Sequence, residues 1–220
     1  MRWIVALLLL VGLPALAEVP PGAPVGFTSE RWQIRQGRWR FEPDGTLLCE
    51  GHGLSSLLFL KGEKLRDLDL SVEVMFLGPE SSAGLVFRSA GEHYYDDMSF
   101  YQFEWYTEGH HHNRRLSLMT KNPRWKQIVT PILRDPPMNR WVRFRVRAEG
   151  DHLQAFIDGA QVFDKRDRTF TKAGRLGLHV FQARQVRFRD LRIEKLCFGA
   201  AAAAPGRPGA TTTAPERRSQ

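Results

Sequence analysis

The sequence has little cysteine: 220 residues contain two, Cys49 and Cys197. No Cys/His constellation accompanies them, so neither thiol is predicted to be a nucleophile. Both lie near the ends of the predicted folded region, where an oxidising compartment permits a disulfide that would join those ends. Two buried free thiols are the equal alternative.

Long hydrophobic runs are equally scarce. The one such run, Ile4 to Leu13, is too short to span a membrane. It follows Arg2 and precedes a small-residue triplet that ends at Ala17. This order predicts a secretory signal peptide over residues 1–17. We therefore expect a secreted or periplasmic protein that has no stable membrane insertion after cleavage. A retained anchor is the alternative.

Sustained helical periodicity is also missing outside this leader. Short stretches instead alternate apolar and polar residues, and turn signals such as Asp158-Gly159 separate them. The expected strands lie in residues 68–78, 83–90, 99–107, 114–121, 125–130, 141–150, 152–158, 161–165, 174–183 and 186–196. Many short strands with hairpin turns predict an all-β fold, an antiparallel two-sheet β-sandwich of the jelly-roll type.

Composition divides the chain into four parts. Residues 18–26 are expected to form a short linker after the signal peptide, and residues 27–198 one sandwich domain with a single large core. Residues 199–220 are rich in Ala, Pro, Gly and Thr without apolar periodicity, which predicts a disordered tail.

The formal net charge is +8, a balance that is compatible with an anionic partner. However, Arg143, Arg145 and Arg147 alternate with apolar residues, as on a solvated strand face. No nucleic-acid recognition motif accompanies them, so nucleic acid is not an expected partner.

Several stretches together resemble the concanavalin A-like lectin/glucanase superfamily. They are "GRWRFEPDGTLLCEGHG", "LSVEVMF", "SSAGLVFRS", "YYDDMSFYQFEW", "WVRFRVRAEGDHLQAFIDGAQVFD" and "GRLGLHVFQARQVRFRDLRI". Within this superfamily, residues 32–193 look most like the 3-keto-disaccharide hydrolase family and next most like laminin-G-type modules. The resemblance implies two stacked curved sheets that recognise carbohydrate on the concave face or at its rim loops.

The stretch Phe100–Tyr106 has two different faces, because side chains alternate along a strand. One face is aromatic, whereas the other carries Gln102, Glu104 and Tyr106 beside Phe100. The resemblance implies that such a polar pair points toward the concave side. We predict that this second face is the floor of a sugar-binding groove, with Gln102 and Tyr106 contacting the substrate. A wet sheet surface is the alternative.

Three further residues are candidates for the same face: Arg88, His179 and Phe181. The resemblance implies hydrolysis of a 3-keto-glycoside by general acid/base chemistry. In that interpretation Glu104 is the base, and burial against aromatic side chains raises its pKa. His179 or Arg88 stabilises the enolate. Arg88 and Phe181 would contact the sugar. The alternative is a non-catalytic lectin-like or laminin-G-like module that binds a glycan or a protein.

Two loops raise the question of a metal. His110–His112 are consecutive and diverge in an extended backbone, which favours an exposed His-rich loop over an ion site. Asp96 and Asp97 are weak candidates for calcium, which needs six to eight oxygens. No cofactor is predicted, and a divalent metal remains an open alternative. The sequence does not indicate an oligomeric state.

Acidic residues also alternate along "DLDLSVE", at Asp67, Asp69 and Glu73. Laminarinase-like family 16 glycosidases carry two glutamates and an aspartate along one strand, a pattern from which these residues depart. The stretch is therefore expected to be a solvated outer face, and retaining glycosidase chemistry is disfavoured.

Overall fold

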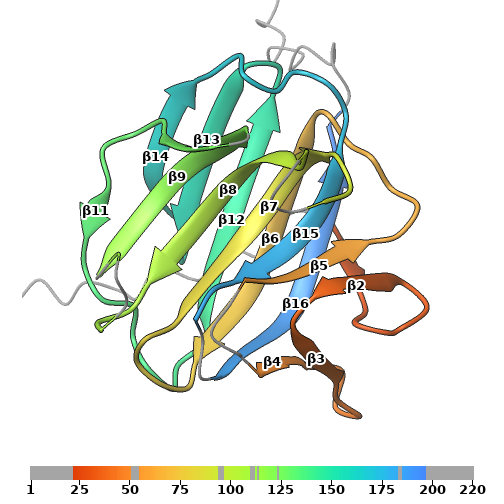
Figure 1. Ribbon diagram of the computed structural model, residues 1–220, viewed down its shortest axis with the longest axis vertical. Helices are drawn as coiled ribbons and strands as arrows, with labels where there is room; N and C mark the ends of the chain where they lie inside the picture. The colour runs from red at the N-terminus through yellow and green to blue at the C-terminus, as the bar shows by residue number, and fades with distance from the viewer. Residues whose placement is uncertain are drawn as a thin grey trace, which may run out of the picture.

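The computed structural model describes residues 22–50, 55–93, 97–109, 112, 114–122, 124–182 and 185–196. These residues form sixteen strands in two sheets of eight and no helix, with one sheet behind the other (Figure 1). In this part of the chain, then, no helix is long and apolar enough to cross a membrane. The predicted signal peptide and the predicted tail lie outside the described residues.

The first sheet has the order β14-β13-β12-β6-β16-β4-β3, with β1 beside β16. Its strands are β1 (Ala23–Val25), β3 (Arg38–Phe41), β4 (Leu47–Glu50), β6 (Leu68–Phe76), β12 (Val142–Glu149), β13 (His152–Ile157), β14 (Ala160–Arg166) and β16 (Gln185–Lys195).

The second sheet has the order β10-β9-β8-β7-β15-β5-β2, with β11 beside β9. Its strands are β2 (Trp32–Gln36), β5 (Ser56–Leu60), β7 (Ser82–Ala90), β8 (Ser99–Tyr106), β9 (Arg115–Asn122), β10 (Arg124–Gln127), β11 (Ile132–Leu133) and β15 (Arg175–Val180). Neighbouring strands in both sheets are antiparallel, which confirms the predicted sandwich.

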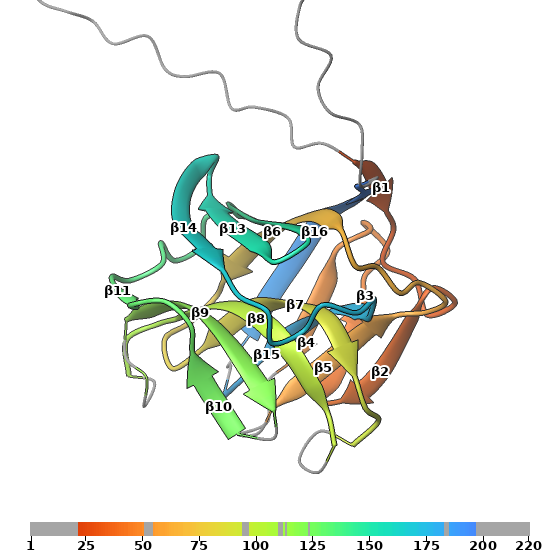
Figure 2. The same cartoon turned by 90° about the horizontal axis from the view of Figure 1, so that it is seen from above.

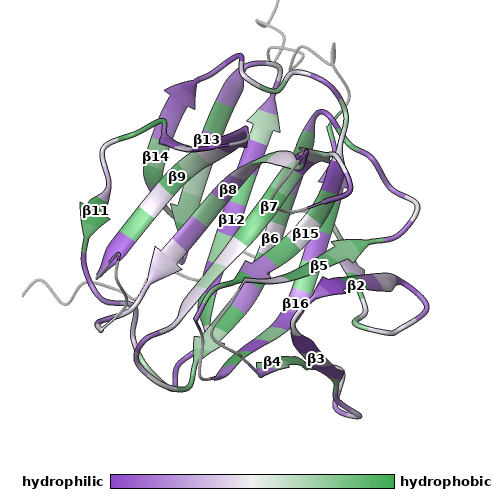
Figure 3. Cartoon of the chain, viewed as in Figure 1, coloured by the Kyte–Doolittle hydropathy of each residue, from purple (hydrophilic) through white to green (hydrophobic). Residues whose placement is uncertain are grey.

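The main core lies between the sheets, because most strands turn apolar residues inward. A smaller apolar cluster that includes Leu57, Phe59 and Phe100 lies on the other face of the second sheet. Figure 3 shows alternating bands of hydropathy along several strands. In β12, Val142, Phe144 and Val146 are buried and alternate with arginines. From the opposite sheet Phe103 of β8 packs on Phe144, with ring centroids 5.6 Å apart. The aromatic face predicted for Phe100–Tyr106 therefore points into the core.

The arginines on the outer face of β12 are less solvated than their pattern predicted. Arg145 donates to both oxygens of Asp69, at 2.8 and 2.7 Å, and Asp69 is 2% exposed. Arg143 pairs with Glu73 and Asp190. The predictions of solvated faces were wrong here, because the carboxylates of β6 and the arginines of β12 lie within reach and neutralise one another.

The ends of the described chain meet at one side of the first sheet. Strand β1 lies in the stretch predicted to be linker, and it pairs with β16 through Val25 and Leu191 (Figure 2). Cys49 of β4 is a buried free thiol, and burial raises its pKa to about 12. Cys197 lies outside the described residues, so the choice between a disulfide and two free thiols is untested.

Phe144 tests where the core lies. We expect Phe144→Ala to lower the free energy of unfolding by about 3–5 kcal/mol, because it removes a ring that both sheets pack against. Urea denaturation of the two proteins measures the loss. Leu133→Ala, at a site that is 77% exposed, is the control and should cost under about 0.5 kcal/mol. Equal losses in both variants would contradict this placement of the core.

Candidate functional site

The candidate site lies on the face of the second sheet that points away from the core. One cross-strand row on this face contains Ser117 of β9, Glu104 of β8, Gly84 of β7 and His179 of β15. Directly opposed residues in a sheet point to the same face. The structure thus brings Glu104 and His179 together on the face that the alternation predicted.

Gly84 makes this meeting possible. It stands between Glu104 and His179 in the row, and a Cβ there would lie 2.7 Å from the Phe103 carbonyl oxygen and 2.9 Å from the Glu104 Cβ. Real Cβ atoms do not approach so closely, so a side chain at this position would displace the carboxylate. The bare backbone leaves the space in which carboxylate and imidazole meet.

Four side chains converge on the Glu104 carboxylate. Ser82 Oγ donates to Oε1 at 2.5 Å, and His179 Nδ1 lies 3.0 Å from the same oxygen. Tyr106 donates to Oε2 at 2.5 Å, and the Gln102 amide donates to it as well. Glu104 and Gln102 have no exposed surface. The alternative of a wet sheet surface is therefore wrong at these two residues.

The pKa of Glu104 is lowered, not raised as the sequence suggested. Burial alone would raise it, and this is the largest single influence. Attraction to the His179 ring when it is protonated, the hydrogen bond from that ring, and the hydroxyls of Ser82 and Tyr106 together outweigh burial. Glu104 is consequently a buried anion, and its lone pairs are occupied by donors from its own sheet.

The contacts of His179 indicate which ring nitrogen holds a proton. Both Glu104 Oε1 and the Gln102 amide nitrogen approach Nδ1, at 3.0 and 2.8 Å. The Gln102 amide nitrogen can only donate, and it already donates to Glu104 Oε2, so the carboxylate decides the assignment. A bare Nδ1 would turn its lone pair toward Glu104 Oε1 in a low-dielectric site, which is costly. We therefore assign the proton to Nδ1, donated to Glu104, and this bond orients the imidazole so that Nε2 points the other way.

Three buried polar atoms on the same face have no hydrogen-bond partner among the described residues. They are Gln102 Oε1, Ser117 Oγ and Gln127 Oε1. Gln102 and Ser117 have no exposed surface. Gln102 pairs with Met119 of β9, which in turn pairs with Gln127 of β10, so the two glutamines lie on one face. Buried polar atoms are rarely left unpaired in native proteins. These atoms are suited to the hydroxyl and carbonyl groups of a ligand.

Trp125 belongs to this site, although sequence reasoning did not select it. It lies on β10, its ring is 5.5 Å from that of Phe100, and its centroid is 6.3 Å from the His179 imidazole. Trp125 is 44% exposed, whereas the neighbouring Phe100 and His179 are buried. The expected strand at residues 125–130 contained it, but only the pairing of Trp125 with Lys121 shows which face it occupies.

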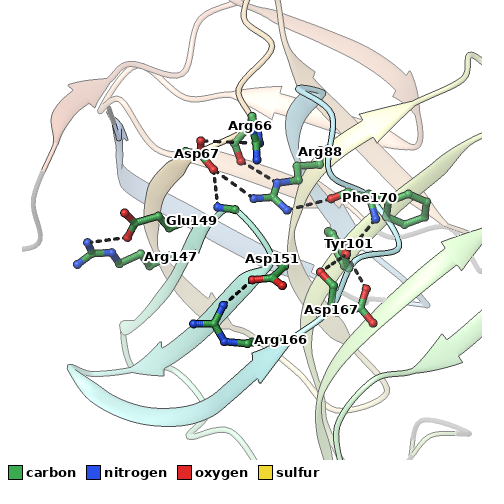
Figure 4. A network of polar contacts seen from close by, with 11 residues as sticks. Arg66, Asp67, Arg88, Tyr101, Arg147, Glu149, Asp151, Arg166, Asp167 and Phe170 are labelled. Carbon is green, nitrogen blue, oxygen red and sulfur yellow. Dashed lines mark hydrogen bonds and ion pairs between the residues drawn. The ribbon is translucent and has the colours of Figure 1, made fainter. Parts of the chain in front are cut away.

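Arg88 lies elsewhere, so its prediction as a substrate-binding residue is corrected. Strand β7 bulges between Phe87 and Ala90, and Arg88 has a φ of 52°. The bulge turns the side chain toward the other sheet, where it donates to the carbonyls of Arg66 (2.7 Å) and Phe170 (2.9 Å) (Figure 4).

In that position Arg88 links the two sheets. Its guanidinium lies 3.6 Å from Asp67 and 5.9 Å from the centroid of the Tyr101 ring. Figure 4 shows the network continuing from Tyr101 to Asp167, whose carboxylate accepts its hydroxyl at 2.6 Å. These contacts assign Arg88 a structural role.

Phe181 contacts the site through its backbone. Its amide donates to Ser82 Oγ at 3.0 Å, and its carbonyl accepts from the Ser82 amide at 3.1 Å. Ser82 is thereby held in place to donate to Glu104. The predicted contact of the Phe181 ring with a sugar stays a prediction.

The described residues contain no group of three or more His, Cys, Asp or Glu side chains that could hold a metal ion. His112 packs edge-on against Tyr106, with ring centroids 5.0 Å apart. Asp97 accepts the backbone amides of Glu92 and His93, as in a tight turn. His110, His111 and Asp96 lie outside the described residues.

A comparison with family models matches residues 26–194 to the 3-keto-alpha-glucoside-1,2-lyase-like domain. A comparison with curated proteins gives no significant match. The matched range covers nearly all the strands and the whole of the site described above.

Solved structures share the fold. A carbohydrate-binding module, CBM66 from Bacillus subtilis, superposes with a TM-score of 0.64 at 17% identity, over 74% of this chain and 95% of that one. A prokaryotic β-1,3-1,4-glucanase (lichenase) derived from a mouse hindgut metagenome gives 0.57 at 10% identity, over 79% and 98%. At such identities the likeness concerns the fold alone.

The lowered pKa of Glu104 predicts a pH-dependent stability. A carboxyl whose pKa is lower in the folded state stabilises the protein above its unfolded pKa of about 4.3, and this stabilisation is lost as the pH falls through the folded pKa. We expect Glu104→Gln to cost about 1.5–3 kcal/mol near pH 7. This cost should shrink as the pH falls below about 4.

Urea denaturation of the variant and wild type across that range measures the difference. Glu149→Gln, whose side chain is 45% exposed, is the control and should change stability little at any pH. A cost of Glu104→Gln that is constant with pH would contradict a buried anion.

The corrected position of Arg88 predicts a structural effect. Arg88→Met removes two hydrogen bonds to carbonyls and the partner of Asp67, so it should lower the free energy of unfolding by about 2–4 kcal/mol. Arg147→Met, on a side chain that is 43% exposed, should change it by less than about 0.5 kcal/mol. A variant as stable as wild type in denaturant titration would refute the structural assignment.

Proposed function

Because the chain belongs to the 3-keto-alpha-glucoside-1,2-lyase-like family, we propose that it cleaves 3-keto-glycosides at the Glu104–His179 pair. The observation that carries the proposal is a buried carboxylate bonded to an imidazole, beside a buried hydroxyl to which the described part of the chain offers no hydrogen-bond partner. These groups supply an oriented base and a hydrogen-bond donor in one place.

The chemistry begins at the carbon between the ketone and the glycosidic bond. The ketone at C3 makes the hydrogen on C2 acidic, so a base can take that proton while the electron pair moves toward the carbonyl as an enolate. The electron pair of the enolate then forms the C1–C2 double bond as the C1–O bond breaks. The leaving oxygen takes up a proton, and water can later add across the double bond.

The contacts favour His179 as the base, in place of the sequence-based choice of Glu104. Four donors surround Glu104 and lower its pKa, which makes it a weak base. Its role is then to position His179, because it accepts the Nδ1 proton and leaves Nε2 to take the proton from C2. Nε2 can return that proton to the leaving oxygen.

Ser117 is suited to stabilise the enolate. Its hydroxyl lies on the strand beside Glu104, is fully buried and finds no hydrogen-bond partner within the described ranges of the chain. A pre-positioned donor in a dry site stabilises developing negative charge more strongly than the same donor does in water. Ser117 therefore takes the stabilising role that the sequence suggested for Arg88, because the side chain of Arg88 points away from this face.

A non-catalytic glycan-binding module is the second candidate. The saturated hydrogen bonding of Glu104 favours it, because a carboxylate with four donors resembles a structural anion as much as a catalytic one. The fold of a carbohydrate-binding module is similar to this one. Both candidates use the same face of the second sheet and differ in whether His179 moves a proton.

Export is part of the proposal. It rests on the leader pattern of residues 1–17, with its single apolar run and its small-residue triplet. The N-terminal sequence of the protein recovered from an expressing cell tests it, and the expected first residue is Glu18.

Turnover of 3-keto-disaccharides by the purified mature protein tests the enzymatic proposal. We expect release of 3-keto-glucose, and a loss of kcat of about 10²-fold or more in His179→Asn, because the base is removed. Ser117→Ala should lower kcat by about tenfold or more. His152→Asn, at a partly exposed histidine of the first sheet that pairs with Asp164, is the control.

Each outcome distinguishes the candidates. Saturable sugar binding without turnover would replace the enzyme with a binding module. Unchanged turnover in a folded His179→Asn protein would remove His179 as the base. Loss of activity in a chelator would require a metal, and the prediction that no cofactor is needed would then be wrong.

A further inference from the structure

Strand β10 presents a second pair of side chains beside the candidate site. Trp125 and Gln127 are two residues apart, so both point to the face that carries Glu104. Trp125 lies opposite Lys121, which lies opposite Phe100, and Gln127 aligns with Gln102 across Met119. The pair therefore continues the site outward to the edge of the sheet.

Trp125 is held and yet accessible. Its ring meets Phe100 nearly edge-on, at an interplanar angle of 74°, an arrangement that aromatic pairs favour. It is 44% exposed, although Phe100 and His179 beside it are buried. A fixed aromatic surface that is open to solvent suits the CH-rich face of a sugar ring, since apolar contact then needs little reordering.

The amide oxygens provide the polar half of a sugar site. Gln127 Oε1 and Gln102 Oε1 are both buried, and no residue that the structure describes donates a hydrogen bond to them. Sugar hydroxyls are donors that would satisfy them, and such buried acceptors discriminate strongly against ligands that lack the hydroxyl. The two acceptors lie in one row, at the two sides of Met119.

We propose that Trp125 and Gln127 form the subsite that holds the leaving sugar ring of the disaccharide. The proposal rests on the proposed function, which places the 3-keto ring at His179 and Ser117. Those two residues are at most 2% exposed, whereas Trp125 borders solvent at 6.3 Å from the imidazole. The cleaved ring therefore occupies the open side, from which it can leave.

Two substrates that differ only in the leaving group test this subsite. A 3-keto-disaccharide offers Trp125 and Gln127 a second ring, whereas the 3-keto methyl glycoside offers neither a ring nor further hydroxyls. We expect Trp125→Ala and Gln127→Ala each to lower kcat/KM for the disaccharide by about tenfold. Neither variant should change kcat/KM for the methyl glycoside by more than about twofold.

Trp141→Ala is the matched control, because Trp141 lies beside Arg189 of the first sheet, away from this face. It should change neither value. Trp125→Phe should restore most of the disaccharide activity, since the aromatic surface is kept. Equal losses on both substrates, or no loss on either, would overturn the subsite and leave the proposed function standing.

Binding distinguishes failure of the subsite from failure of the proposed function. If the wild type turns over neither substrate, the reaction is wrong, and calorimetry with the unoxidised disaccharide decides the subsite. Binding that is weakened about tenfold in Trp125→Ala and Gln127→Ala, but not in Trp141→Ala, would retain a sugar site at β10. No binding, or equal binding by all variants, would overturn it.

Discussion

A carboxylate without exposed surface, Glu104, is the group on which the candidate site depends. Its burial would be costly if donors did not surround it, and the donors come from three neighbouring strands of one sheet. Ser82 reaches it from β7, Tyr106 and Gln102 from its own strand β8, and His179 from β15. The register of these strands thus determines the charge, the orientation of the imidazole and the side on which a substrate can approach.

The sandwich supplies that register in a rigid form. Glycine at position 84 leaves the gap that carboxylate and imidazole share, and the packed core behind the sheet prevents the strands from sliding past one another. Arg88 shows how sensitive such an arrangement is. One bulge in β7 turns its side chain to the other side of the sheet, where it joins the two sheets and has no part in the candidate site.

Alternation along the chain predicted much of this. It separated the two faces of Phe100–Tyr106, and it placed His179 on the face of Glu104. Alternation says nothing about bulges, which depend on a backbone angle, so Arg88 was misplaced. It also says nothing about which strands are neighbours, so Trp125 was missed. The direction of the Glu104 pKa depends on donors from three strands, and no single stretch of sequence contains that balance.

The division of labour between Glu104 and His179 is the central claim. Nitrogen-15 NMR of the imidazole tests it most directly, with the His179 signals identified by their loss in His179→Asn. The account predicts that Nδ1 holds a proton through its bond to Glu104 while Nε2 is bare, and that Glu104→Gln weakens this preference. A ring whose Nδ1 is bare while Nε2 holds the proton would contradict it.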